Sequence, residues 1–258
     1  MSLIVQKYGG SSLADLDKIR LVASRVKKYG DEGHELVVVV SAMGKTTDQL
    51  ISLAKNLNPF PPERELDMLL STGEQVSISL LAIALSSLGV KSVSLTGGQA
   101  GIITTDTYTK AKIFHIDTRR IKELLLNHQV VIVAGFQGRT PQGDITTLGR
   151  GGSDITACAL AAALDADFCE IYTDVRGVFT ADPHLVPQAQ KIARLSYEEM
   201  SEMATLGAKV LQPRAVDFSQ AYGVRVHVRS TFSEEEGTWV EELNNMEEVR
   251  VKAITHSG

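Results

Sequence analysis

Cysteine, proline and aromatic residues are scarce in this sequence. Its 258 residues include two cysteines, Cys158 and Cys169, 7 prolines, and only 5% Phe, Trp and Tyr. Two cysteines without paired metal-ligand spacing cannot form a disulfide framework, and their small or apolar neighbours predict reduced thiols in the core. The six histidines are also scattered, so we predict no metal site built from protein ligands.

Long basic and long apolar runs are missing as well. The chain has 26 Lys and Arg against 31 Asp and Glu, a formal charge of -5, and no block of consecutive basic residues, which disfavours nucleic acid as a partner. The first ten residues, MSLIVQKYGG, lack the features of a signal peptide, and we find no apolar run near the roughly 18 residues of a membrane span. We therefore predict a cytoplasmic protein with no membrane partner.

What the sequence does contain is an alternation of short apolar runs and longer helical patterns. The runs lie at 3–5, 36–40, 90–95, 130–134, 168–173 and 224–228, and continuous runs this short are typical of strands buried on both faces. Helices are predicted at 13–28, 63–88 and 155–164. The alternation predicts an α/β protein with a mostly parallel sheet covered by helices.

The first predicted helix, 13–28, has an apolar stripe. The stripe consists of Leu16, Ile19, Ala23 and Val26, and Ser12 is the predicted N-cap. At the other end of the chain, residues 249–255 alternate as in an edge strand.

The first candidate functional loop joins a strand to a helix and contains Lys7, Gly9, Gly10 and Ser11. Its two glycines allow the backbone to approach an anion, the helix start presents amide groups, and Lys7 adds a positive charge. The loop therefore favours phosphate binding, with an ordinary glycine turn as the alternative.

The second loop, 41–47, is similar to a Walker A motif only superficially. The first glycine of that motif would fall at Val39, inside a strand, so we reject the motif. Ser41 and Thr47 remain candidate hydrogen-bonding groups.

The third loop, 149–154, nearly matches a dinucleotide fingerprint. Asp154 occupies the position of the third glycine, which leaves a dehydrogenase only weakly supported. Arg150 beside glycine amides is better suited to clamp a carboxylate through its two-pronged guanidinium.

A fourth loop, 173–183, consists of turn residues, and Glu74 and Lys209 are isolated charges on helical segments. Each of these residues is, by itself, more often a turn-forming residue or a solvated charge than a ligand group.

Taken in order, these loops closely resemble the aspartate kinases of the amino-acid kinase family. The resemblance spans nearly the whole chain and rests on KYGGSS from Lys7, SAMGKTTDQL from Ser41, STGEQVS around Glu74, GFQG from Gly135, TTLGRGGSD ending at Asp154, IYTDVRGVFTADP around Asp182, and LGAKVLQPRAV around Lys209.

The resemblance implies a three-layer α/β/α sandwich with a mostly parallel central sheet. It implies a catalytic domain at 1–232, made of an aspartate-binding lobe (1–134) and an ATP-binding lobe (135–232). Residues 233–258 would form a linker and the start of a truncated or absent ACT regulatory region.

The resemblance also implies site residues. Catalytic roles are implied for Lys7, Asp154 and Lys209, with Asp154 organising the two lysines. The substrate would be bound by Ser41, Thr47, Glu74, Arg150, Gly151, Gly152 and Ser153. The ammonium of that substrate would meet Glu74, and its α-carboxylate would meet Arg150. The nucleotide would be bound by Lys7, Gly9, Gly10, Ser11, Thr173, Asp174, Phe179, Asp182 and Lys209.

The implied reaction moves a phosphoryl group from ATP to the side-chain carboxylate of L-aspartate, the first step toward lysine, threonine and methionine. A carboxylate with a reference pKa near ~4 is already ionised and needs no general base. The reaction instead needs neutralisation of two anions, by lysines, amides and a Mg²⁺ held mainly by ATP.

Two departures from the family pattern stand at Arg176, where relatives often have an acidic residue, and His184, where arginine is usual. Relatives usually continue into paired ACT domains that bind lysine or threonine, so feedback inhibition of this molecule is in doubt. We expect a homo-oligomer, or an assembly with a regulatory chain that contains ACT domains.

Alternatives to an aspartate kinase are a related kinase acting on glutamate, a blocked glutamate or a carbamate, and a non-catalytic ligand-binding subunit. Glu74 and Arg150 together suit a free amino acid, which disfavours the blocked substrates.

Overall fold

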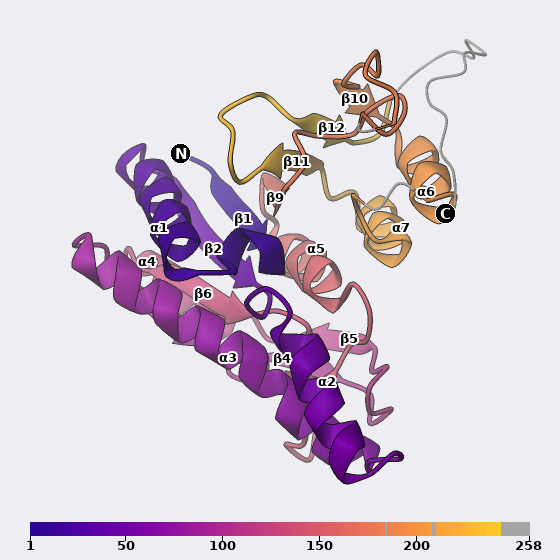
Figure 1. Ribbon diagram of the computed structural model, residues 1–258. Helices are drawn as coiled ribbons and strands as arrows, with labels where there is room; N and C mark the ends of the chain where they lie inside the picture. Colours follow the sequence, from indigo (N-terminus) through magenta and orange to yellow (C-terminus); the bar gives the residue numbers. More distant parts are fainter. Residues whose placement is uncertain (184, 208–209, 244–258) are drawn as a thin grey trace.

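A central sheet of eight strands organises the fold in the computed structural model, which describes residues 1–183, 185–207 and 210–243 (Figure 1). The strand order is β10-β12-β11-β9-β1-β2-β6-β3. The six strands from β11 to β3 run parallel, and β12 is antiparallel to β11. The strands are β1 (Leu3–Tyr8), β2 (Glu35–Val40), β3 (Ser92–Leu95), β6 (Val130–Ala134), β9 (Phe168–Thr173), β10 (Arg194–Leu195), β11 (Val226–Ser230) and β12 (Thr238–Val240).

Helices cover both faces of this sheet and give three layers. The helices are α1 (Leu16–Asp31), α2 (Thr46–Leu57), α3 (Glu63–Ser87), α4 (Arg119–Leu126), α5 (Gly152–Leu164), α6 (Tyr197–Thr205) and α7 (Pro213–Tyr222), with a short 3-10 helix η1 (Gly10–Leu13). Apolar residues of α1 and α3 form one core with the sheet, and residues of α4, α5, α6 and α7 form a second core on the opposite face. This confirms the predicted α/β sandwich, and all six predicted strands are present.

A second, four-stranded sheet was not predicted. It has the order β5-β4-β7-β8 and consists of β4 (Ile102–Thr104), β5 (Ile113–Ile116), β7 (Gln137–Arg139) and β8 (Ile145–Thr147). Strands of three or four residues are too short to show a periodic pattern, so the sequence contains little sign of them.

The predicted start of the first helix is wrong. Asp15, and not Ser12, is the N-cap of α1, and its side chain accepts a hydrogen bond from the Lys18 amide. The Ser12 hydroxyl lies 2.6 Å from the Thr231 hydroxyl and so links two loops at one edge of the sheet. Leu16, assigned to the apolar stripe, is 54% exposed.

α3 also corrects the sequence analysis, because by length and composition alone it could cross a membrane. Its Ile78, Leu81 and Leu85 pack against the central sheet, and Asp67 and Glu74 are buried on the same helix. This is the pattern of a core helix in a globular fold.

The two cysteines are free and buried, in agreement with the prediction. The predicted edge strand at 249–255 lies outside the described residues.

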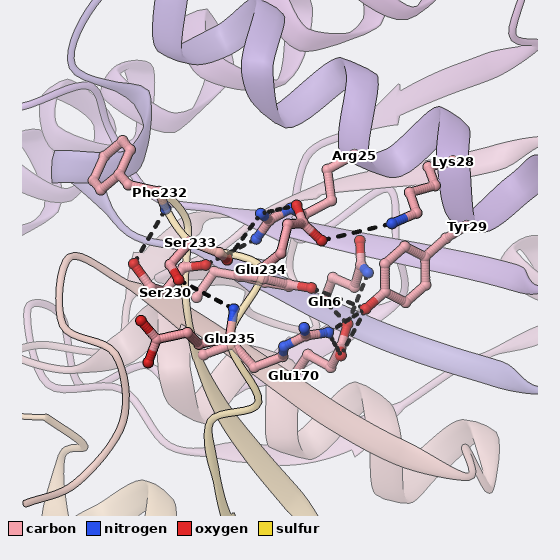
Figure 2. A network of polar contacts seen from close by, with 12 residues as sticks. Gln6, Arg25, Lys28, Tyr29, Glu170, Ser230, Phe232, Ser233, Glu234 and Glu235 are labelled. Atoms are coloured by element: carbon pink, nitrogen blue, oxygen red, sulfur yellow. Dashed lines mark hydrogen bonds and ion pairs between the residues drawn. The ribbon is translucent and has the colours of Figure 1, made fainter. Parts of the chain in front are cut away.

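Glu170 of β9 is the centre of a buried polar network (Figure 2). It is 2% exposed, its Oε2 accepts hydrogen bonds from Gln6 at 2.8 Å and Tyr172 at 3.1 Å, and its Oε1 accepts from Tyr29 at 2.9 Å and Arg229 at 3.2 Å. One carboxylate therefore ties together β1, β9, β11 and α1.

Arg25, one turn before Tyr29 on α1, extends this network. Its guanidinium donates to the carbonyls of Ser230 and Ser233 and to the Glu234 carboxylate (Figure 2). It also lies over the Tyr172 ring. The loop after β11 is thereby fixed to α1.

We predict that Glu170→Leu destabilises the fold by about 3 kcal/mol or more, because Arg229 loses its buried counter-charge. Burial works to raise the pKa of Glu170, but contacts with His227 and Arg229 hold that pKa below its ordinary value, so the carboxylate is ionised. Urea unfolding measures the loss.

The double variant Glu170→Leu/Arg229→Met should recover most of that loss, and Asp17→Asn, in an exposed ion pair with Arg20, is the control. If Glu170→Leu alone were as stable as the parent, the role assigned to Glu170 would be contradicted.

Candidate active site

The parallel strands end in register and bring several loops to one edge. Tyr8 stands opposite both Val40 and Tyr172, and Val40 stands opposite Ala134. The loops after β1, β2, β6 and β9 therefore start side by side, at the edge where ligands bind in open α/β sheets.

Lys7 and Asp154 form an ion pair at this edge. Lys7 Nζ lies 2.7 Å from Asp154 Oδ1, and their side chains are only 13% and 10% exposed. Lys7 belongs to β1 and Asp154 to the first turn of α5, so the pair joins the sheet to the start of a helix. A side chain at Gly9 would come within 3.4 Å of Lys7 Nζ, which places this ammonium against the glycine loop.

The glycine loop after β1 interlocks with the loop after β2. The Gly44 amide donates to the Gly10 carbonyl at 3.0 Å. A Cβ at Gly10 would lie 2.9 Å from the Ala42 carbonyl oxygen, so only glycine permits this approach. The exposed Ser11 follows in η1.

Glu74 is a buried carboxylate close to the loop after β2. Its Oε1 accepts a hydrogen bond from the Ala42 amide at 3.2 Å, and its Oε2 is buried without a partner among the residues that the structure describes. Gly73 makes this approach of α3 possible, because a Cβ there would lie 2.8 Å from the Ala42 Cβ. Burial raises the pKa of Glu74 to about 7.

The start of α5 is packed closely against its surroundings. Gly151 has φ +74° at the N-cap, and a Cβ on it would overlap Gln212. Ser153, 8% exposed, lies against Gly135, where a Cβ would come within 2.8 Å of the serine Oγ. Gly152 is buried beside Phe136.

Three predicted substrate contacts lie nearer the surface. Arg150 is exposed, and it forms no ion pair with any residue that the structure describes. Ser41 directly follows β2, Thr47 lies in the first turn of α2, and both are half-buried.

The predicted nucleotide residues follow β9. Thr173 ends that strand, its carbonyl accepts the Thr231 amide, and its hydroxyl donates to the Asp174 carboxylate at 3.0 Å. Phe179 forms an isolated bridge with Lys191. The Asp182 carbonyl accepts hydrogen bonds from the amides of Leu185 and Val186.

Two residues singled out from the sequence, Lys209 and His184, lie outside the described residues. Arg176 is exposed and pairs with Glu235 at 3.0 Å.

The sequence analysis missed Asp67, which holds the loop before α5 in place. Its Oδ1 accepts from the Thr147 hydroxyl at 2.6 Å, and its Oδ2 accepts from the Thr147 and Thr109 amides at 2.9 Å. The available signal was an acidic residue seven positions before Glu74, two helical turns away on the same face of α3.

Across the residues with described positions, no group of three or more His, Cys, Asp or Glu side chains could hold a metal ion. A metal at this edge would therefore depend largely on ligands supplied by a bound anion.

We predict that Glu74→Gln stabilises the fold at high pH. The pKa of Glu74 is about 7 in the folded protein and 4.5 ordinarily, so the folded state holds the extra proton between these values. Stability contributed at this position therefore falls as pH rises from 4.5 to 7. A neutral glutamine side chain avoids this cost, so the free energy of unfolding should rise by up to about 3 kcal/mol at pH ~8 and change little at pH ~5.

Urea unfolding at both pH values checks this, with Glu63→Gln, exposed on the same helix, as the control. If Glu74→Gln changed the free energy of unfolding equally at both pH values, the assignment of a raised pKa to Glu74 would be contradicted.

Known proteins provide an independent comparison. The model of the "Amino acid kinase family" matches residues 2–230. An aspartokinase of Thermus thermophilus is 55% identical over 243 residues, which cover 94% of this chain and 60% of that protein. This chain thus spans about 60% of the length of the curated relatives it matches.

Solved structures of similar fold belong to the same kind of protein as these relatives. An aspartate kinase from Synechocystis has a TM-score of 0.84 and 52% identity, over 95% of this chain and 41% of that one. E. coli aspartokinase III, in complex with aspartate and ADP, has a TM-score of 0.82 and 28% identity, over 94% of this chain and 65% of that one.

Because the family model covers most of the chain and the structures agree over nearly its whole length, this chain belongs to the amino acid kinase family.

Proposed function

We propose that this chain is the catalytic region of an aspartate kinase, which transfers the γ-phosphoryl group of ATP to the side-chain carboxylate of L-aspartate and forms 4-phospho-L-aspartate. Relatives that are 50% to 57% identical carry the name aspartokinase. The observation that carries the proposal is the meeting, at one sheet edge, of the Lys7–Asp154 pair, the glycine loop and the buried Glu74 carboxylate.

Lys7 is proposed to neutralise the transferred phosphoryl group. Its ammonium is nearly buried beside Gly9, so it is weakly screened by water, and Asp154 fixes its position. A preorganised charge of this kind stabilises developing negative charge without reorganisation. Gly10 and Ser11 complete the proposed phosphate loop, and Lys209 is proposed as a second ammonium.

Glu74 and Arg150 are proposed to bind the free amino acid. The Oε2 of Glu74, which has no partner in the described part of the chain, suits a substrate ammonium that would supply a hydrogen bond and favour the ionised carboxylate. The exposed Arg150 guanidinium suits the α-carboxylate. Other proposed substrate contacts are Ser41, Thr47, Gly151, Gly152 and Ser153.

The nucleotide is proposed to lie on the β9 side of the site. Thr173, Asp174, Phe179 and Asp182 would line its pocket. In this assignment, residues 1–134 form the aspartate lobe and 135–232 the ATP lobe of a catalytic domain at 1–232.

The aspartate carboxylate is proposed to attack the γ-phosphorus in line, while ADP leaves. The acceptor is already ionised, so no side chain needs to remove a proton. Bound Mg²⁺ would supply charge neutralisation for the phosphates, which would also provide most of its ligands. The protein's task is then to align two anions that repel each other.

Cytoplasmic location and assembly, either with itself or with a chain that contains ACT domains, complete the proposal. Sedimentation of the chain alone, and then with an added chain that contains ACT domains, would separate self-association from dependence on a partner.

Incubation with ATP, Mg²⁺, aspartate and hydroxylamine tests the main proposal, because hydroxylamine traps an acyl phosphate as a hydroxamate. We expect aspartyl hydroxamate, with aspartate the best substrate among aspartate, glutamate, N-acetylglutamate and carbamate. A larger turnover with another acid would support a different kinase of the family, and ligand binding without ADP release would support a non-catalytic subunit.

Lys7→Ala should reduce kcat by at least about a hundredfold, because the transferred phosphoryl group loses its buried counter-charge. Circular dichroism should remain that of the folded protein, while the melting temperature should fall because Asp154 loses its nearly buried counter-charge. Lys28→Ala, exposed on α1, serves as the control. Unchanged turnover in Lys7→Ala would remove this residue from the site.

Arg150→Ala should raise the KM for aspartate about tenfold or more while the KM for ATP stays within about twofold, because one charge-assisted fork to the substrate is lost. Steady-state kinetics with each substrate varied in turn measures both constants. Lys110→Ala, another exposed cation on a nearby loop, is the matched control.

A further inference from the structure

A cavity of about 600 Å³ lies on the small sheet, and none of the candidate active-site residues with a described position lines it. Ile145, Arg139, Ile103 and His115 stand opposite one another on β8, β7, β4 and β5. Directly opposite residues in a sheet project to the same face, so these four side chains form one row across the cavity floor. The other face, with Ile102 and Thr104, packs into the core.

Two glycines bring the wall of the cavity close to this floor. Gly101 has φ +83°, and a Cβ on it would lie 2.1 Å from the Asp117 carbonyl oxygen. A Cβ on Gly98 would lie 3.0 Å from the Arg139 side chain. The turn after β3 can therefore pack directly against the aliphatic stem of Arg139, a residue that lines the cavity.

The cavity lining carries uncompensated positive charge. Arg139 and Arg120 both line it, and neither forms an ion pair with an acidic side chain in the described part of the chain. Arg120 stands at the start of α4, and the exposed His115 adds a further donor.

The acidic groups near the cavity are already engaged. Asp117 lines it, but Arg119 binds both of its oxygens, and these hydrogen bonds hold the pKa of Asp117 well below its ordinary value. Asp144, next to Gly143 on the rim, binds Arg64 at 2.8 Å. Neither carboxylate is therefore available to neutralise Arg120 or Arg139.

We propose that this cavity binds a small molecule with two or more negative charges, such as a phosphate ester or a polycarboxylate. Two guanidinium groups provide paired donors that match phosphate and carboxylate oxygens. Ile103 and Ile145 provide an apolar floor beside them, and the volume is that of a metabolite site rather than a single-ion site. The site is separate from the substrate pocket and does not depend on the proposed kinase activity.

Isothermal titration calorimetry with tripolyphosphate and, separately, with citrate tests the proposal. We expect at least one probe to bind, and Arg139→Gln and Arg120→Gln each to weaken that binding about tenfold or more, because each removes a charge-assisted contact. Binding of tripolyphosphate but not citrate would indicate that the natural ligand is a phosphate ester. Binding of citrate but not tripolyphosphate would indicate a polycarboxylate. The Arg139→Lys variant should bind the probe more weakly than the parent, since lysine keeps the positive charge but lacks the paired donors of a guanidinium.

Two controls separate this cavity from other anion sites. Lys122→Gln removes one charge from α4 at a position that does not line the cavity, and Lys7→Ala disables the glycine loop. Lys122→Gln should leave probe binding unchanged. Lys7→Ala should remove only tripolyphosphate bound at the proposed phosphate loop and leave the binding that depends on Arg139 unchanged. Binding that is lost in Lys7→Ala but kept in Arg139→Gln, or the absence of binding by both probes at ~10 mM, would overturn the proposal. Circular dichroism confirms that each variant is folded.

Discussion

The site depends on how β1 is held in the middle of the sheet. Side chains alternate along a strand, so Gln6 and Lys7 project to opposite faces. Gln6 donates to the buried Glu170 carboxylate on one face, and Lys7 pairs with Asp154 on the other. The two contacts fix the height and rotation of this strand end. The glycine loop that follows then has a defined position relative to α5.

Two buried glutamates show how differently the fold treats the same side chain. Glu170 has hydrogen bonds to both oxygens and a cation beside it, so it stabilises the structure as an anion. Within the described ranges, Glu74 has one hydrogen bond to another residue and an oxygen without a partner, which leaves this part of the fold with an unsatisfied group. Native proteins contain few such groups, and one that lies at a ligand-binding edge points to a missing partner. The contrast separates a structural carboxylate from a candidate binding one.

The six parallel strands of the central sheet could be predicted because they are continuous apolar runs, such as that of Val37 to Val40, whereas the short β10 and β12 at its edge were not predicted. The loops at the carboxyl edge could also be predicted, since glycine, serine and aspartate concentrate there. The prediction failed for the small sheet, whose strands of three or four residues are too short to show a period, and for the cap of α1, where Ser12 and Asp15 are both good cap residues. The burial of Glu74 and the role of Asp67 depend on close approaches at Gly73 and Thr147, which only the folded chain reveals.

The interlocked turns at Gly10 and Gly44 have a mechanical consequence. Backbone contact between them, with no side chain in between, makes the first two crossovers of the sheet a single stiff unit. Any closing motion around bound molecules must then come from segments beyond this unit, such as the exposed stretch around Arg150 or the long excursion after β9. The two interlocked turns would stay fixed while those other segments move toward them.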